Sequence, residues 1–354
     1  MKVALVYDRV NKWGGAERVL LALHAMFPHA PLFTSVYNPK TASWAKVFAV
    51  KTSFLQHIPF VRSHHQLFPF LMPLAFESFS FDDFDLVISV TSEAAKGIIT
   101  KPHTRHICLC LTPTRYLWSG YAHYFNNAFF RFLATPVIQY LRTWDSIASQ
   151  RPDTMVAISE EVRKRIKKYY QRESIVIYPP YMLTETSVES QKGEYFLVVS
   201  RLSRFTSYKR VDIAVQAATK LNIPLKIIGE GDIEYYKKIA GPTVEFLGKV
   251  SDTDLLSYYA GCCGLIFPGI EDFGLVMVEA QAMGKPVIAL RGGGALEIVK
   301  EGETGEFFDR QTVESLSQVL KSFDGSRYNK ETCKQNAKRF SLEAFQKKVQ
   351  AVTS

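Results

Sequence analysis

The chain has 354 residues and a hydrophobic content of 47%, which excludes a disordered chain and suits two α/β domains better than one ordinary core. The formal net charge of +9 at pH 7 calls for an acidic partner, such as anionic lipid, nucleic acid or the phosphates of a substrate. The sequence contains no recognisable nucleic-acid-binding module, so no nucleic-acid partner is expected.

The amino terminus predicts a strand, a glycine turn and a helix in that order. Residues Lys2–Tyr7 form a short apolar run, and Gly14 and Gly15 precede a helix expected over Val19–Met26. Glycine permits positive φ and close approach of a ligand, so this helix start is a candidate contact for phosphate or for acceptor hydroxyls. The spacing is not Gly-x-Gly-x-x-Gly, which disfavours a nicotinamide enzyme.

Two further apolar runs predict strands in the first half. One is Asp85–Ser89, and the other begins the segment His106–Trp118, in which Arg115 is a candidate contact for a phosphate or for the acceptor. His103 and His106 stand at the start of this region, and ordinary surface or core histidines are the favoured interpretation of both.

A change of composition marks a domain boundary. Met155–Ile158 predicts a strand, and Ser159 is placed to cap a helix that runs through Tyr170. After Pro180 the chain becomes polar and loses its periodicity, which predicts a linker over residues 181–193. We therefore expect a first domain over 1–180, a second over 194–335, and a terminal segment over 336–354 that contains a last helix.

The second half alternates strands and helices, which predicts parallel sheets in both halves. A buried-strand pattern over Phe196–Leu202 delivers Arg201, and Lys209 follows just ahead of a helix. An Arg fork and a Lys ammonium can neutralise a diphosphate, both in a bound donor and as charge develops on a leaving group. Each cation alone is more often a surface residue.

The segment Gly269–Ala280 is the most informative motif of the chain. It follows a predicted buried strand and places Glu271 in a loop and Glu279 in a helix. Gly274 opens that helix, where free N–H groups and the dipole attract a phosphate or a polarised hydroxyl. The two carboxylates can accept hydrogen bonds from two hydroxyl-bearing parts of one sugar nucleotide. A solvated surface is the alternative for such a pair.

These blocks resemble the retaining glycosyltransferases of the GT-B class often called family 4. The resemblance spans nearly the whole chain and is strongest over residues 271–289, where Glu-Asp-Phe-Gly-Leu and Val-Glu-Ala-Gln-Ala-Met-Gly-Lys-Pro match the family pattern. It implies two Rossmann-like, doubly wound parallel-sheet domains that face a cleft. In such proteins the first domain is the acceptor side, the second binds the nucleotide sugar, and the terminal helix crosses back onto the first.

The resemblance also implies roles for single residues. Glu279 is expected to hold the ribose hydroxyls, Glu271 those of the donor sugar, and Arg201 and Lys209 the diphosphate, so that Glu271, Arg201 and Lys209 form the catalytic set. The donor-binding candidates are Gly14, Gly15, Lys249, Val250, Phe273, Gly274, Leu275 and Glu279. The nucleotide diphosphate sugar is the co-substrate, and no metal or cofactor is expected.

One position departs from the family pattern. Leu111 stands where many relatives have a histidine that faces the donor sugar. Retaining transfer in this class is thought to need no protein nucleophile, because the leaving phosphate can take the acceptor proton on the same face. The departure therefore bears on the identity of the sugar more than on the type of reaction.

The implied activity is transfer of a hexose to a glycan or lipid-linked acceptor. The stretches Ile270–Gly274 and Arg291–Glu297 are similar to those of mannosyltransferases of bacterial surface-polysaccharide pathways, which makes GDP-mannose the first donor hypothesis. Two alternatives stay open. One is a GT-B nucleotide-sugar epimerase, which needs acid and base groups that the sequence does not reveal, and the other is a non-catalytic, membrane-bound sugar-nucleotide sensor.

The location is expected to be cytoplasmic, at the inner face of the membrane where it contacts lipid. Five cysteines, with Cys108 and Cys110 on a predicted strand, indicate reduced thiols, and neither a secretion signal nor a bilayer-spanning run is visible. Large apolar residues mix with basic ones over Phe54–Leu74 and Tyr121–Arg142, which suits an anionic membrane surface. Packing of these aromatics within the first domain accounts for them equally well.

Overall fold

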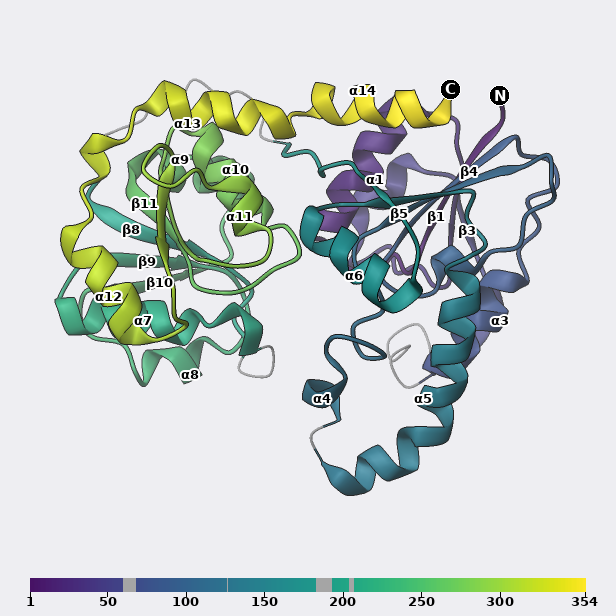
Figure 1. The fold of residues 1–354 in the computed structure, drawn as a ribbon, viewed down its shortest axis with the longest axis horizontal. Helices are drawn as coiled ribbons and strands as arrows, with labels where there is room; N and C mark the ends of the chain where they lie inside the picture. The colour runs from purple at the N-terminus through teal and green to yellow at the C-terminus, as the bar shows by residue number, and fades with distance from the viewer. Residues whose placement is uncertain (60–67, 126, 183–192, 204–206) are drawn as a thin grey trace. The chain divides into compact units, whose positions relative to one another are not determined.

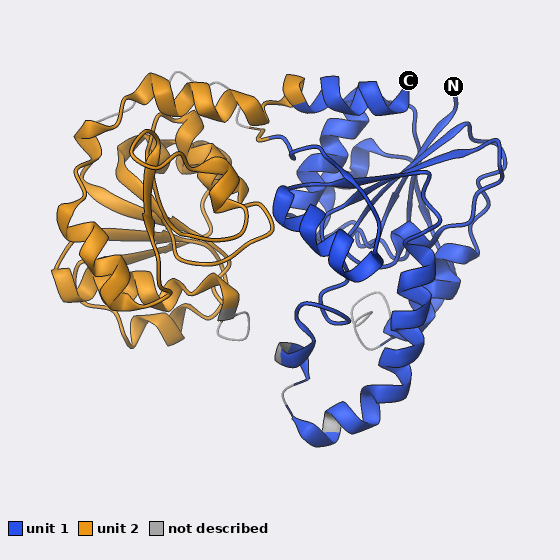
Figure 2. Ribbon diagram, viewed as in Figure 1, with its two compact units in different colours: residues 1–180, 345–354 blue, residues 181–344 orange. Residues whose placement is uncertain are grey.

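The chain folds into two compact units in a computed structural model, which describes residues 1–59, 68–125, 127–182, 193–203 and 207–354. Unit 1 contains Met1–Pro180 and Phe345–Ser354, and unit 2 contains Tyr181–Ala344 (Figure 2). Most of the predicted linker lies outside the described residues. The terminal helix α14 spans Leu342–Thr353, and its Lys348 ammonium lies 5.1 Å from the centre of the Tyr178 ring in unit 1.

Unit 1 is built on a parallel sheet with the order β3-β2-β1-β4-β5-β6-β7 (Figure 1). Its strands are β1 Val3–Tyr7, β2 Leu32–Thr34, β3 Val50–Thr52, β4 Leu86–Thr91, β5 Arg105–Cys110, β6 Thr154–Ala157 and β7 Ile175–Val176. Its other α-helices are α1 Gly15–Met26, α3 Met72–Glu77, α4 Tyr121–Tyr124, α5 Ala128–Ala148 and α6 Glu160–Tyr170. Central strand β4 is buried along its whole length, as expected for a parallel strand covered on both faces.

Unit 2 repeats this plan with a parallel sheet in the order β10-β9-β8-β11-β12-β13. Its strands are β8 Tyr195–Val199, β9 Leu225–Ile228, β10 Val244–Gly248, β11 Cys262–Phe267, β12 Val287–Leu290 and β13 Gly305–Phe308. Its α-helices are α7 Val211–Leu221, α8 Ile233–Lys237, α9 Asp252–Gly261, α10 Leu275–Ala282, α11 Ala295–Ile298, α12 Val313–Ser322 and α13 Lys330–Ala337. The prediction of two doubly wound parallel sheets is confirmed.

The strand order defines where a ligand can reach each unit. In both sheets successive strands are added first on one side of the first strand and then on the other. The switch point lies between β1 and β4 in unit 1 and between β8 and β11 in unit 2. The loops that leave the carboxyl ends of two such strands diverge, and ligands of open α/β sheets bind in the resulting crevice. The residues that follow β1, β4, β8 and β11 are therefore the first to consider.

Some predicted details are confirmed and others are corrected. Ser159 caps α6 as predicted, since its side chain accepts a hydrogen bond from the backbone N–H of Val162. Helix α1 begins at Gly15, four residues before the predicted start, and Gly14 has an extended φ of 177°. Neither Gly14 nor Gly15 adopts the positive φ that glycine permits. In the described ranges no helix is both long and apolar enough to cross a bilayer.

Candidate active site

The three predicted catalytic residues follow strands at the carboxyl edge of the unit 2 sheet, and two of them are in contact. Arg201 follows β8 and is exposed, and Glu271 follows β11. Lys209 lies in the same β8–α7 connection as Arg201, and its ammonium forms an ion pair with Glu271 Oε1. The side chains of Lys209 and Glu271 are 19% and 21% exposed, so both remain accessible to a ligand at this edge.

The loop that carries Glu271 is fixed on two sides. On one side, the backbone N–H of Ile270 donates to the Tyr208 carbonyl at 3.2 Å, and a Cβ on Gly269 would lie only 2.5 Å from that oxygen. On the other side, the N–H of Gly294 donates to the Glu271 carbonyl at 3.0 Å. The backbone under Glu271 is thereby held in place before any ligand binds, which lowers the ordering cost of binding.

Helix α10 starts at this loop through Gly274. Gly274 has φ +99°, a conformation that suits glycine, and a Cβ there would meet the Met277 methyl carbon at 2.5 Å. No side-chain hydrogen bond caps the helix at Gly274, and Leu275 is its first residue. Phe273 just before it is 3% exposed and packs against the Phe340 ring at 5.4 Å, so it supports the loop from beneath.

The two glutamates of the motif lie in different environments. Glu279 is the fifth residue of α10, about one helical turn beyond the loop. Its side chain is 1% exposed, and the buried Tyr259 hydroxyl donates to its Oε2 at 2.9 Å. Glu271 therefore faces the edge, whereas Glu279 is anchored by Tyr259 inside the unit, a partner that the sequence did not indicate.

Neighbouring loops position the remaining unit 2 candidates along the same edge. The loop after β9 packs against the backbone around Arg201: a Cβ on Gly229 would lie 1.8 Å from the Ser200 carbonyl oxygen. The N–H of Gly229 in turn donates to the Gly248 carbonyl at 2.8 Å, directly before Lys249 and Val250. Lys249 is 74% exposed and lies 3.9 Å from a Glu230 carboxylate oxygen, while Val250 is half-buried.

The corresponding edge of unit 1 is occupied by its own carboxylates. Asp8, which follows β1, is 2% exposed and accepts hydrogen bonds from four successive backbone N–H groups of residues 92–95, at 2.7 to 3.0 Å. The Tyr7 hydroxyl donates to Glu17 at 2.7 Å, and burial followed by the charge of Glu17 raises the pKa of Tyr7 well above its ordinary value. Gly14 lies beside the Glu17 carboxylate: a Cβ on Gly14 would be 3.1 Å from Glu17 Oε2.

Neither His106 nor His103 lies near Leu111, the position where many relatives have a histidine. His106 is at the amino end of β5, fully buried, with its Nε2 2.8 Å from the Ser89 hydroxyl, and burial lowers its pKa to about 3. His103 precedes it and is exposed. Leu111 follows the carboxyl end of the strand, about 16 Å from His106 at the rise of a parallel strand, so neither histidine replaces it. Arg115 is half-buried in the loop beyond Leu111.

A buried ion pair in unit 1 was not predicted from the sequence. Lys96 and Asp145 are each 1% exposed and lie 2.5 Å apart. Asp145 also accepts hydrogen bonds from Thr114, Trp118 and Tyr170, at 2.7 to 2.9 Å. Burial would lower the pKa of Lys96, but the charge of Asp145 and the hydrogen bond to it raise it overall. Lys96 and Asp145 lie far apart in the sequence and belong to no recognised motif, so the sequence does not predict that they form an ion pair.

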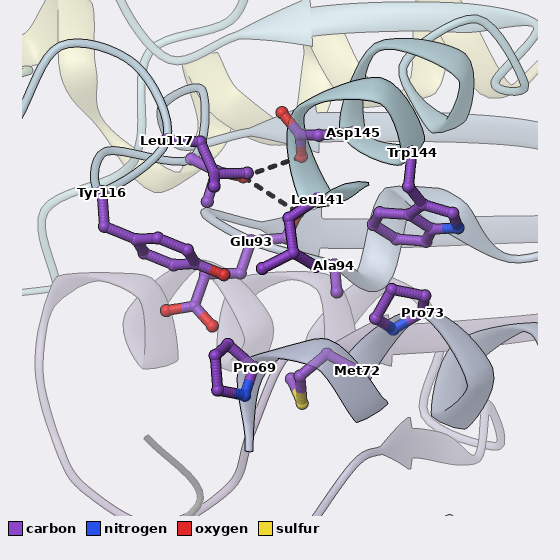
Figure 3. Close-up of a pocket in the computed structure, with 11 residues that line it drawn as sticks. Pro69, Met72, Pro73, Glu93, Ala94, Tyr116, Leu117, Leu141, Trp144 and Asp145 are labelled. Atoms are coloured by element: carbon purple, nitrogen blue, oxygen red, sulfur yellow. Dashed lines mark hydrogen bonds between the residues drawn. The ribbon is translucent and has the colours of Figure 1, made fainter. Parts of the chain in front are cut away.

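This network lines a small cavity rather than a ligand site. Leu141, Trp144 and Asp145 of α5 line it together with Pro69, Met72 and Pro73 (Figure 3), and the Thr114 hydroxyl donates to Asp145 at 2.9 Å. The cavity holds about 10 Å³, roughly room for one water molecule. The network therefore fixes α5 and the loop that contains Arg115 against the sheet. Within the described part of the chain, no group of three His, Cys, Asp or Glu side chains is arranged to hold a metal ion.

Comparison with solved structures identifies the class of fold. The structure of Anabaena HepE in complex with UDP and glucose aligns with a TM-score of 0.71 over 100% of both chains, at 19% identity. Two parallel α/β sheets of this kind are the GT-B fold of glycosyltransferases. Residues 183–340 match the family model described as Glycosyl transferases group 1, and this stretch carries Arg201, Lys209, Glu271 and Glu279.

Two relatives by sequence are named as glycosyltransferases. An uncharacterized glycosyltransferase of Methanocaldococcus jannaschii is 29% identical over 55% of this chain and 56% of its own length. A GDP-mannose-dependent alpha-mannosyltransferase of Corynebacterium glutamicum is 28% identical over 37% of this chain and 33% of its own length. The chain thus matches about half, or less, of the length of these curated relatives.

Proposed function

We propose that the protein is a retaining glycosyltransferase that transfers a hexose from a nucleotide diphosphate sugar to a glycan or lipid-linked acceptor, without a metal ion. The observation that carries this proposal is the Lys209–Glu271 ion pair at the carboxyl edge of the unit 2 sheet, where Arg201 follows the adjacent strand β8. Two cations and one carboxylate at one edge match a ligand that joins a diphosphate to a sugar.

The roles follow from charge and position. Arg201 and Lys209 neutralise the diphosphate in the bound donor and again as negative charge builds on the leaving phosphate. Glu271 then accepts hydrogen bonds from hydroxyls of the donor sugar. Its contact with Lys209 fixes the position of the sugar-binding carboxylate relative to the diphosphate-binding ammonium. The leaving phosphate takes the acceptor proton on the face from which it departs, which retains the anomeric configuration.

The nucleoside end is assigned to the neighbouring loops and to α10. Glu279 binds the ribose hydroxyls and Tyr259 orients its carboxylate, while Lys249 and Val250 contact the base chiefly through their backbone. The diphosphate approaches the start of α10 at the turn formed by Phe273, Gly274 and Leu275. Gly14 and Gly15 of unit 1 remain predicted donor-binding residues, and Arg115 remains a predicted contact for a phosphate or the acceptor.

GDP-mannose is the first donor hypothesis. The Corynebacterium glutamicum relative is named for GDP-mannose-dependent transfer, which supports it, whereas the HepE structure contains UDP and glucose, which keeps UDP-glucose as the next candidate. The test is a thermal-shift panel of GDP-, UDP-, ADP- and dTDP-sugars. A ligand at 100 times its dissociation constant stabilises a fold by about 2.7 kcal/mol, so a true donor gives a clear selective shift.

The panel and a transfer assay together separate the alternatives. Selective stabilisation by one sugar nucleotide, followed by incorporation of its labelled sugar into an acceptor, is the expected result. Selective binding without transfer favours the non-catalytic sensor, and conversion of the donor sugar into its epimer favours a nucleotide-sugar epimerase. If no sugar nucleotide stabilises the protein, the donor site assigned to unit 2 is wrong.

A further inference from the structure

Helix α5 of unit 1 presents a large apolar face to solvent. The helix spans Ala128–Ala148, 21 residues, with Pro136 inside. Exposed apolar side chains recur along it with the spacing of one helical face: Phe129 at 66%, Phe132 at 76%, Leu133 at 57%, Val137 at 38% and Tyr140 at 49%. We refer to these five residues as the outer face of α5.

The outer face is distinct from the face that anchors the helix. Ile138 and Leu141 are 5% and 2% exposed and pack with Leu117, and Asp145 is held by Lys96. The anchoring contacts therefore come from positions other than those of the outer face. A surface helix of a globular protein ordinarily carries polar residues opposite its core face, whereas α5 is apolar on both.

The segment that packs beside α5 also bears exposed apolar side chains. Pro69, Met72 and Pro73 line the small cavity against Leu141 and Trp144 of α5 (Figure 3). On this segment Phe70 and Leu74 are 43% and 54% exposed. Packing within the first domain accounts for Phe68, Tyr121 and Phe125 of the two segments singled out in the sequence, but Phe70, Leu74 and the outer face of α5 are exposed.

Charge identifies the kind of partner. Residues 94–144 contain no Asp or Glu, and their charged residues are Lys96, Lys101, Arg105, Arg115, Arg131 and Arg142. Unit 1 as a whole has 23 Lys and Arg against 12 Asp and Glu, a net charge of +11, whereas unit 2 has 20 against 22, a net charge of −2. The positive charge of the protein thus belongs to the unit that bears the exposed apolar helix.

We propose that the outer face of α5 inserts into the interfacial layer of an anionic lipid bilayer and holds unit 1 at the membrane surface. From Phe129 to Tyr140 the face is about 16 Å long, which suits a helix lying in the plane of the bilayer. Aromatic and aliphatic side chains enter the boundary between headgroups and acyl chains, and a segment free of carboxylates approaches anionic headgroups without repulsion. This contact needs no transfer reaction and can be tested without one.

The experiment is co-sedimentation of the full chain with lipid vesicles. One set is phosphatidylcholine with about a third phosphatidylglycerol, and the other is phosphatidylcholine alone. The variant Phe132→Ser/Leu133→Ser removes the two adjacent exposed side chains of the outer face. The matched control, Val47→Ser/Tyr235→Ser, removes two side chains of 54% and 45% exposure outside α5. Thermal unfolding checks that both variants fold.

The expected result is sedimentation with anionic vesicles and much less with neutral ones. The Phe132→Ser/Leu133→Ser variant should bind anionic vesicles about tenfold or more weakly, since it withdraws two large apolar side chains from the bilayer. The control should bind like the parent protein. Arg131→Glu should bind anionic vesicles more weakly than the parent protein does, and its binding should change less with salt concentration.

Three outcomes would overturn the proposal. The first is a parent protein that does not sediment with anionic vesicles, and the second is an outer-face variant that binds them as strongly as the control does. The third is a parent protein that dimerises in light-scattering measurements and an outer-face variant that is monomeric, with neither binding vesicles, since a second copy of the chain would then be what covers α5.

Discussion

Replacing Lys209 by Met is the sharpest test of the assigned donor site. In the free protein the Lys209 ammonium is paired with Glu271, and both side chains are about one-fifth exposed. If Lys209 binds the diphosphate, the variant loses one charge-assisted contact, worth roughly 1.5–3 kcal/mol, which weakens nucleotide diphosphate binding about 10- to 150-fold. The partly exposed ion pair itself contributes at most about 1 kcal/mol, so its loss barely changes the free energy of unfolding.

Glu271→Gln gives the complementary half of the same test. Removing this carboxylate takes a negative charge away from the diphosphate, so the nucleotide diphosphate alone should bind as well as before or more tightly. The complete sugar nucleotide should bind more weakly, because a charged acceptor of sugar hydroxyl bonds is gone. Titration calorimetry with the nucleotide diphosphate and with its sugar conjugate measures both effects, and the double variant Lys209→Met/Glu271→Gln gives their coupling.

The matched control is Lys237→Met, which breaks an exposed ion pair with Glu234 on α8 of the same unit. It should leave both affinities unchanged. The assignment of Lys209 is refuted if Lys209→Met binds the nucleotide diphosphate with a dissociation constant within about twofold of that of the parent protein. The loss of a direct charged contact should reduce the binding free energy by more than that.

Three further predictions concern buried groups. Glu279→Ala should weaken donor binding by roughly 1.5–3 kcal/mol in the same calorimetric assay; an unchanged dissociation constant would remove its role at the ribose. Asp145→Asn should destabilise unit 1 by about 3–5 kcal/mol in urea unfolding, because it leaves Lys96 charged and buried, while Asp82→Asn at an exposed pair should cost less than about 1 kcal/mol. Burial lowers the pKa of His106 to about 3, so this side chain stays neutral in the fold but takes up a proton in the unfolded chain below about pH 6.5. Stability should therefore fall as the pH decreases from about 6.5 toward 3, by up to about 1.4 kcal/mol per pH unit, and His106→Gln should flatten this slope; parallel slopes for the two proteins would contradict the argument.

Much of the fold was predictable because its signals are local. Apolar runs such as Leu86–Thr91 mark the parallel strands, and Ser159 marks a helix start through its own side chain. The sequence placed the start of helix α1 too late because Gly15 and Ala16 do not continue the apolar periodicity of the helix and no capping side chain precedes them. Signals of this kind act over a few residues, so they find elements and their order but not what the elements contact.

The site was predictable only where a motif keeps its members close in the chain. Glu271 and Glu279 share one loop and helix, and a resemblance to a family placed Arg201 and Lys209 with them. The anchoring of Glu279 by Tyr259 depends on a contact between α9 and α10 that no spacing encodes. The same holds for Lys96 with Asp145, whose partnership exists only once α5 packs on the sheet.

The two units share one strand order, yet their edges suit different ligands. In unit 1 the backbone N–H groups of residues 92–95, which would attract an anion, already bind the Asp8 carboxylate, and Glu17 lies beside Gly14. The negative charge of these two buried carboxylates would repel a phosphate arriving there, whereas a neutral sugar hydroxyl would meet no such repulsion. In unit 2 the same edge offers Arg201 and Lys209 to an anion. The charge of the two edges therefore favours diphosphate binding in unit 2, and it makes Gly14 and Gly15 better candidates for contacts with sugar hydroxyls than with phosphate.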